Sequence, residues 1–106
     1  MANTFTNTRA ALTGSSAVVY TCPVGATAIV LLSQATNVDN TGATPVTLIW
    51  NDGTNDTHLT KEVSIPAYAS IGLLSGKLVL TSGNTLKANS DASSRVELTL
   101  SILEIT

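Results

Sequence analysis

The clearest hydrophobic pattern in the chain lies between Thr44 and Pro66, where apolar and polar residues alternate on both sides of Asp52-Gly53. Because the side chains of a strand alternate between its two faces, this pattern predicts two strands, each with one apolar face. Asp-Gly favours a hairpin turn, since glycine tolerates positive φ and aspartate can hydrogen-bond its own backbone. The predicted β-hairpin has apolar rows made of Val46, Leu48 and Trp50 in the first arm and Leu59, Val63 and Ile65 in the second.

Strand patterns separated by short turns continue through the rest of the chain. Residues 29–32 are apolar on both faces, which is typical of a strand that is central in a sheet or covered by another subunit. The even positions from Val96 to Ile102 form one apolar row. With the hairpin, the pattern predicts an all-β, antiparallel β-sandwich of about eight strands, with a jelly-roll topology left open. The predicted strands outside the hairpin are residues 16–22, 26–36, 70–74, 77–81, 85–89 and 95–105.

The first fifteen residues are polar, with Phe5 and Leu12 as their large apolar side chains. We therefore expect an extended N-terminal arm over residues 1–15 and a β-sandwich domain over residues 16–106. An arm of this kind becomes ordered when something holds it. It is expected to dock on the sheet of its own domain or on a neighbouring molecule.

Composition adds that the surface is weakly charged. Charged residues make up 11% of the chain, against about 25% in typical proteins. The net charge is −2, and 43% of the residues are hydrophobic. A surface built from Thr, Ser, Asn and Gly gives weak repulsion between copies, which favours a protein that packs against neighbours.

The same composition argues against several classes of protein. The five Lys and Arg residues are scattered, so no basic stripe is present to follow phosphates and nucleic-acid binding is not expected. No apolar run reaches the ~18 residues of a membrane span, and the N-terminus lacks the pattern of a signal peptide. The single Cys22 gives no intrachain disulfide framework and fits a reducing cytoplasm.

Candidate chemistry is sparse. His58 is the one histidine and lies on the polar face of the hairpin with Thr60 and Glu62, but no nucleophile or second carboxylate is near in sequence. Cys22 shows no catalytic signature with His58 and is predicted to be a buried small hydrophobe. We therefore expect no enzymatic activity and no catalytic residues or cofactor.

Oxygen-bearing side chains gather in two predicted loops, but their spacing does not match the EF-hand calcium loop. Asx residues are common in turns for backbone reasons, so no metal site is predicted. Trp50 is interpreted as a core or interface anchor in preference to a sugar-stacking residue. The loop residues considered as ligands are Asp39, Asn40, Asp52, Asn55 and Asp56.

Residues 18–30, which read VVYTCPVGATAIV, resemble the opening of small tailed-phage virion proteins. The resemblance extends over residues 16 to 105, and it implies a β-sandwich structural part of a virion with no catalytic residues. Asn84 stands where the resemblance leads us to expect an acidic residue. The later similar segments are Val46–Leu48, Asp52-Gly53, Leu59–Lys61, Val63–Pro66, Leu78–Leu80 and Gly83–Lys87.

The resemblance implies a capsid decoration (cement) protein that stabilises the phage head by binding between capsomers. Its partners would be the major capsid protein or other virion proteins and further copies of itself, as a homotrimer. It would be made in the host cytoplasm and reside on the capsid surface. A neck, tail or fibre component, with receptor or glycan binding, is the alternative. The candidate interface residues are Phe5, Arg9, Leu12, Trp50 and His58.

Overall fold

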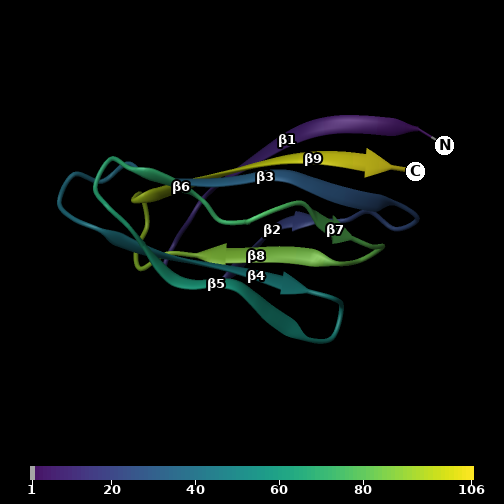
Figure 1. The fold of residues 1–106 in the computed structure, drawn as a ribbon. Coiled ribbons are helices and arrows are strands. Elements are labelled where there is room, and N and C mark those ends of the chain that lie inside the picture. The colour runs from purple at the N-terminus through teal and green to yellow at the C-terminus, as the bar shows by residue number, and fades with distance from the viewer. Residues whose placement is uncertain (1) are drawn as a thin grey trace.

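The computed structural model describes residues 2–106, which form two β-sheets packed face to face (Figure 1). The described residues contain nine strands and no helix, which confirms the predicted all-β sandwich. Across this part of the chain, no helix is long and apolar enough to span a membrane. The strands are β1 (Asn3–Ala11), β2 (Ala17–Thr21), β3 (Thr27–Asn37), β4 (Thr44–Asn51), β5 (Asp56–Ile65), β6 (Ser70–Gly72), β7 (Leu78–Leu80), β8 (Thr85–Asn89) and β9 (Val96–Ile105).

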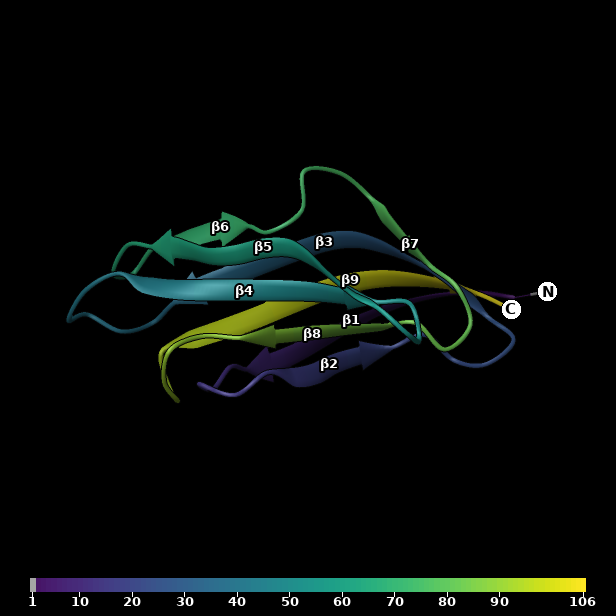
Figure 2. The same ribbon diagram turned by 90° about the horizontal axis from the view of Figure 1, so that it is seen from below.

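The strand pairing is antiparallel and nested. Sheet A has the order β1-β9-β3-β6, with β7 also pairing with β3, and sheet B has the order β2-β8-β4-β5. The first strand thus pairs with the last, the second with the next to last, and β4 with β5 in the middle. Figure 2, seen from below, shows β4 and β8 of sheet B in front of β9 and β1 of sheet A.

The core lies between the sheets, and β9 supplies its most regular row. Val96, Leu98, Leu100 and Ile102 are all buried, as the even apolar positions predict. They share the core with Leu48 and other buried residues of sheet B. Burying one such side chain stabilises the fold by about 1.5–3 kcal/mol relative to leaving it in water.

The segment expected to be an arm is largely an edge strand of sheet A. β1 pairs with β9 over its whole length, from Asn3 opposite Ile105 to Ala11 opposite Glu97. The chain then turns inward at Leu12, whose backbone N–H donates to the Val96 carbonyl at 2.9 Å. The arm was expected to dock either on its own domain or on a neighbouring molecule. In the structure it docks on the sheet of its own domain.

Strand β3 lies in the centre of sheet A but is not covered on its outer face. Its register with β9 shifts between Val30 and Leu32, so Leu31 is an extra residue at a β-bulge. Leu31 and Leu32 are both exposed. The central position of β3 agrees with the sequence pattern, whereas the predicted burial of both its faces does not occur at Leu31 and Leu32.

The hairpin of β4 and β5 is present, but its second arm is irregular. The pairing shifts twice, between Val46 and Leu48 and again between Leu48 and Ile49. Side-chain hydroxyls replace ladder bonds there: Leu48 N–H donates to Thr60 Oγ1, and Glu62 N–H donates to Thr47 Oγ1, both at 3.0 Å. Glu62 also has a φ of 51°, in the left-handed region that L-residues rarely adopt. The simple alternation read from the sequence does not show these bulges.

Two buried polar residues differ in whether their side chains have hydrogen-bond partners. Asn37 donates from Nδ2 to the carbonyls of Gly42 and Ile65 at 3.0 and 2.9 Å, and so links β3 to the hairpin. Thr44 is equally buried, but its hydroxyl has no hydrogen-bond partner within the described residues. A buried hydroxyl without a partner costs about 1–3 kcal/mol of desolvation.

Thr44→Val is therefore expected to keep or raise the free energy of unfolding, because valine has nearly the same shape and no hydroxyl to desolvate. Asn37→Ala should lower it by about 2–3 kcal/mol, since it leaves the buried Ile65 carbonyl unpaired and also removes the bond to the Gly42 carbonyl. Urea unfolding followed by circular dichroism measures both. A loss above about 1 kcal/mol for Thr44→Val would contradict the assignment of that hydroxyl as unsatisfied.

Candidate interaction surface

A row of apolar side chains crosses the outer face of sheet A. Phe5 of β1 pairs with Leu103 of β9, Leu103 pairs with Ile29 of β3, and Ile29 pairs with Val79 of β7. Directly paired residues on neighbouring strands project to the same face. Because the even residues of β9 point into the core, Leu103 and the three residues aligned with it point outward.

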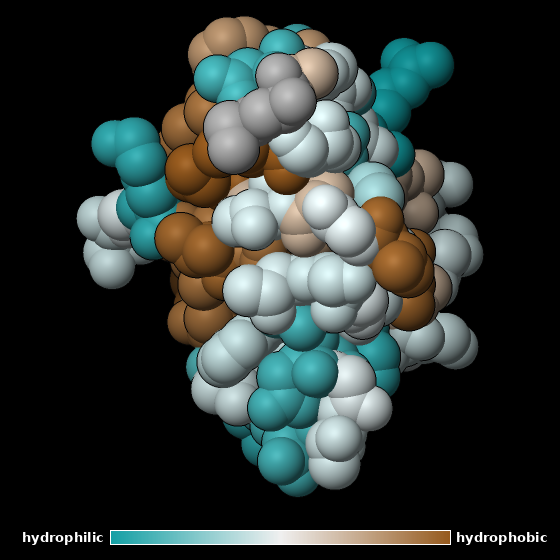
Figure 3. Space-filling model, turned by 90° about the vertical axis from the view of Figure 1, so that its right-hand side faces the viewer, coloured by the Kyte–Doolittle hydropathy of each residue, from teal (hydrophilic) through white to brown (hydrophobic). Residues whose placement is uncertain are grey.

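Much of this row is exposed to solvent. Phe5 is 73% exposed and Val79 54%, and next to them the bulge residues Leu31 and Leu32 are 38% and 43% exposed. Figure 3 shows hydrophobic side chains gathered at the left of the end view. A contiguous apolar area on a surface marks a site of interaction. We call it the outer apolar patch, made of Phe5, Ile29, Leu31, Leu32, Val79 and Leu103.

The surface around Leu31 is hollowed on two sides. One hollow of about 180 Å³ lies between Leu31, Phe5 and Asn7, and another of about 220 Å³ lies between Leu31, Leu74 and Lys77. Projecting side chains of a partner can fit beside Leu31 in both. The patch is therefore uneven, which gives a partner shape as well as apolar area to recognise.

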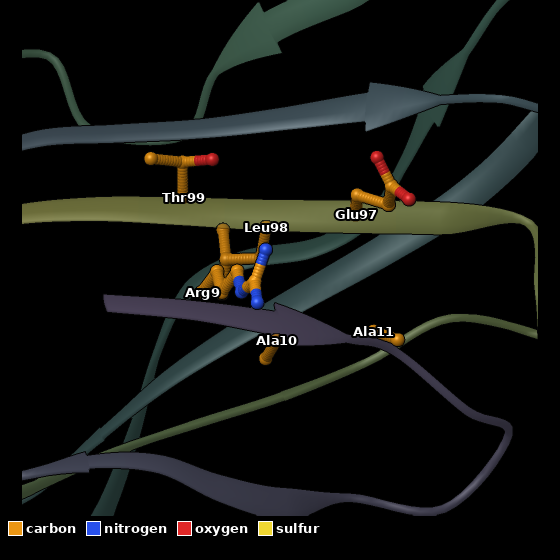
Figure 4. A pocket seen from close by; sticks show the side chains of 6 residues that line it. All are labelled: Arg9, Ala10, Ala11, Glu97, Leu98 and Thr99. Atoms are coloured by element: carbon orange, nitrogen blue, oxygen red, sulfur yellow. The ribbon is translucent and has the colours of Figure 1, made fainter. Parts of the chain in front are cut away.

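The other half of the same face is polar. Arg9 of β1 pairs with Thr99 of β9, and Glu97, two positions before Thr99, pairs with Ala11. These residues line a hollow of about 510 Å³ at the end of the β1–β9 pair (Figure 4). Figure 4 shows Glu97 and Thr99 on one side of β9 and Leu98 on the other. The outer face of sheet A is thus apolar towards the chain termini and polar at its far end.

The five candidate interface residues from the sequence lie in different places. Phe5 and Arg9 are exposed on the outer face of sheet A, on its apolar and polar halves. Leu12 is 2% exposed and belongs to the core, so it offers no surface to a partner. His58 is exposed on β5 of sheet B. Trp50 packs against the core, and its Nε1–H donates to Asn84 Oδ1 at 3.2 Å.

Sequence reasoning missed most of the outer apolar patch. Two local signals were present: residues 29–32 are apolar on both faces, and Leu103 departs from the even row of β9. Their meeting with Phe5 and Val79 depends on the register of four strands far apart in the sequence. A local pattern does not contain that register.

Loop oxygens considered as metal ligands at the hairpin tip are engaged by the protein itself. Asp52 Oδ1 accepts the N–H groups of Asn55 and Thr54 at 2.8 and 2.9 Å, and these bonds hold the pKa of Asp52 below its usual value. Gly53 completes the turn with a φ of 103°. Among residues 2–106, no three His, Cys, Asp or Glu side chains are grouped so as to hold a metal ion.

Asp56 is held in the same tip by two side chains. Its Oδ1 accepts from Asn51 Nδ2 at 2.6 Å and from Lys87 Nζ at 3.1 Å. Both hydrogen bonds, the one from Asn51 foremost, lower the pKa of the Asp56 carboxyl. The tip is a self-contained polar turn braced against β8.

Cys22 and Tyr20 are tied into the packing of the sandwich. The Cys22 thiol is fully buried and lies 3.4 Å from the Ala26 carbonyl, and burial raises its pKa. The Tyr20 hydroxyl of sheet B donates to Glu104 of sheet A at 2.5 Å, and burial raises the pKa of this phenol. A raised thiol pKa lowers the fraction of reactive thiolate. Tyr20 therefore links the two sheets, and Cys22, whose thiol also lies 3.6 Å from the Leu80 carbonyl of β7, is a structural core residue.

No protein-family model and no curated protein sequence matches the chain. Among solved structures, it is similar to a chain from the acid-stable capsid of Helicobacter pylori bacteriophage KHP30, over 100% of this chain and 89% of that one, with a TM-score of 0.60 and 16% identity. It is similar to a chain of the disulfide-linked pili of Bacillus endospore appendages, over 96% and 85%, with a TM-score of 0.54 and 17% identity. A pentameric capsid protein from metagenomic phage sequences matches over 91% and 59%, with a TM-score of 0.48 and 14% identity.

At such identities these likenesses show the fold. The chain has the two-sheet architecture of chains found in a phage capsid and in a bacterial pilus. Fold alone does not fix function, because one fold hosts many roles.

The hydrogen bonds at Asp52 predict an acid-dependent stability. Because the pKa of Asp52 is lowered in the folded state, its contribution is present above the unfolded pKa of about 3.9 and is lost as pH falls through the folded value. Asp52→Asn keeps an oxygen that can accept the same bonds but has no charge to titrate. The drop in thermal midpoint between pH 7 and pH 3 is expected to be smaller in this variant, by differential scanning calorimetry. An equal drop in both proteins would show that Asp52 does not contribute.

Proposed function

We propose that the chain is a bacteriophage virion structural protein, and specifically a capsid decoration protein that stabilises the head by binding between capsomers. The outer apolar patch carries the proposal, because it is an uncovered hydrophobic area on an otherwise weakly charged surface. The sequence resemblance to small tailed-phage virion proteins and the fold of the KHP30 capsid chain support it. The nested strand pairing supports a jelly-roll topology, which is part of the proposal.

The size of the patch sets how strongly one copy can bind. Burying the exposed parts of Phe5, Leu31, Leu32 and Val79 contributes on the order of 5 kcal/mol. Association itself costs about 4–15 kcal/mol, so the patch alone gives weak attachment of a single copy. Polar contacts from the Arg9 half of the face and the joining of several copies would strengthen it. Weak attachment of a single copy favours a protein that acts as part of a repeated array.

A capsid role fits the single cysteine better than a role in a disulfide-linked pilus. Cys22 is fully buried, and its thiol faces backbone carbonyls inside the sandwich. Linking copies through this thiol would require opening the core. Assembly by burial of apolar surface needs no covalent link.

The alternative, a neck, tail or fibre component that binds a receptor or glycan, would use grouped exposed aromatic side chains. Here Phe5 is on β1 at one edge of sheet A, whereas Tyr68 precedes β6 at the other edge. Trp50 and Tyr20 are partly buried, and their polar atoms are engaged by Asn84 and Glu104. The aromatic residues thus favour the decoration role over glycan binding.

The proposal assigns the major capsid protein as the principal partner and the outside of the virion as the location. It includes no catalytic step: the histidine of the chain is on the exposed edge strand β5, and its cysteine is inside the core. The homotrimer implied by the resemblance stays a prediction for the assembled state.

Leu32→Glu tests the docking face without touching the strand edges. A charge placed in the middle of the outer apolar patch must be desolvated on binding, so retention on capsids should fall at least about tenfold. Val24→Glu is the matched control, because Val24 is 91% exposed in the turn between β2 and β3. Co-sedimentation with purified shells of the phage that encodes the chain, stripped of this protein, measures both.

If the two variants bound capsids equally well, the outer apolar patch would not be part of the interface. Absence of the chain from the particle, in an electron-microscopy map at side-chain resolution, would overturn the decoration role itself. Circular dichroism of each variant confirms that the sandwich is intact before binding is measured.

A further inference from the structure

The edges of the two sheets are protected to different degrees. In the described residues, sheet A ends at β1 on one side and at β6 and β7 on the other, and sheet B ends at β2 and β5. An edge strand presents unpaired N–H and C=O groups, which form a template for another strand unless something blocks them. A further strand can therefore be added only at an edge that is not blocked.

Three of these edges carry features that block pairing. β6 and β7 have three residues each, with residues 73–77 looping out between them. β2 has five residues and a register shift between Val18 and Tyr20. β5 has two register shifts, and Glu62 in its middle has a φ of 51°. Short strands and bulges are the usual protection of natural sheet edges.

β1 has none of these features. It has nine residues, an unbroken register with β9, no proline and one charged residue, Arg9. In Figure 1 it runs along the upper margin of the ribbon, with β9 on its inner side. A long, regular and nearly uncharged edge is one that accepts another strand readily.

The direction of the free backbone groups follows from the hydrogen bonds to β9. Ala2 and Thr106 exchange both of their backbone bonds, at 3.1 and 2.9 Å, and Leu12 N–H donates to Val96. In an antiparallel pair, hydrogen-bonded and non-hydrogen-bonded positions alternate. The even residues of β1 therefore bond to β9. The residues whose N–H and C=O groups point to the free edge are Asn3, Phe5, Asn7, Arg9 and Ala11.

We infer that β1 pairs antiparallel with β1 of a second copy of this chain, about a twofold axis at Asn7. Full overlap of Asn3–Ala11 with itself places Asn7 opposite Asn7, Phe5 opposite Arg9, and Asn3 opposite Ala11. Every one of these pairs joins two residues whose backbone groups point to the edge, so the ladder is complete. Five such pairs exchange about ten backbone hydrogen bonds.

The side chains suit this register. Phe5 of one copy faces Arg9 of the other, a pairing in which the guanidinium can lie over the aromatic ring. On the opposite face, Thr6 of one copy comes opposite Thr8 of the other, a favourable cross-strand pair. Registers that bring Phe5 opposite Phe5 or Arg9 opposite Arg9 shorten the overlap, and the latter also sets like charges together. Because β1 is complementary to itself in this register, a second copy of the chain is the partner that fits this edge.

The twofold contact shares Phe5 with the outer apolar patch but otherwise uses the edge of sheet A, whereas docking on a capsid uses the rest of the patch on the face. Loss of one therefore leaves the other measurable. Leu32→Glu is expected to dimerise like the unaltered protein, because Leu32 lies on the central strand β3.

A comparison of the Asn7→Pro and Asn7→Ala variants tests the pairing. Both lose the bond that Ser101 Oγ donates to Asn7 Oδ1, but the proline variant also loses the N–H that points to the free edge. Sedimentation equilibrium should give dimers for the unaltered protein and for Asn7→Ala. For Asn7→Pro it should give a dissociation constant raised about a hundredfold. The inference would be overturned if the unaltered protein were monomeric at about 100 µM, or if the two variants dimerised equally well.

Cross-linking tests the register and does not require a destabilising change. At the twofold axis, the two residues 7 lie with Cα atoms about 5.5 Å apart, within the span of a disulfide. Asn7→Cys is therefore expected to give a covalent dimer on mild oxidation, visible on a non-reducing gel. Ala11→Cys is the control, because the two residues 11 lie at opposite ends of the paired strands. Absence of cross-linking at position 7, or equal cross-linking at position 11, would refute the twofold pairing.

Discussion

The fold depends on the placement of β9 between β1 and β3. Its even residues, from Val96 to Ile102, fill the core, and its backbone pairs with a strand on each side. β9 is the last strand of the chain and β1 the first, so sheet A is complete only when the two ends of the chain meet. The outer face depends on the same strand, because Leu103 joins Phe5 to Ile29. Core, edge and surface therefore share one element.

Much of the fold could be predicted from the sequence because its signals are local. Alternation of apolar and polar residues located the strands to within a few residues, and β8 was placed at residues 85–89 as observed. β1 was missed as a strand, since its Thr and Asn residues make no apolar row and its partner lies at the far end of the chain. The bulges of β5 were missed because hydroxyl groups of Thr47 and Thr60 complete the ladder there.

The candidate surface was predictable in part. Phe5 was singled out as a large apolar residue in a polar segment, and the structure exposes it on the outer face of sheet A. Leu12 was singled out for the same reason but turns into the core directly after β1. A single apolar residue in a polar stretch thus does not show whether its side chain points into the core or to solvent. The answer depends on where the strand ends, and that depends on pairing with β9.

Edge and face are coupled through the odd residues of β1. Those residues point their backbone groups to the free edge and their side chains to the outer face, so a strand added at the edge also extends the face. In an antiparallel pair of copies, the apolar half of one face lies beside the polar half of the other. The two outer apolar patches then sit diagonally across the twofold axis. Such a pair would hold two separate docking sites at a fixed distance, and two weak attachments joined rigidly bind far more tightly than one. A bridge between two neighbouring subunits is what a protein that reinforces a shell has to provide.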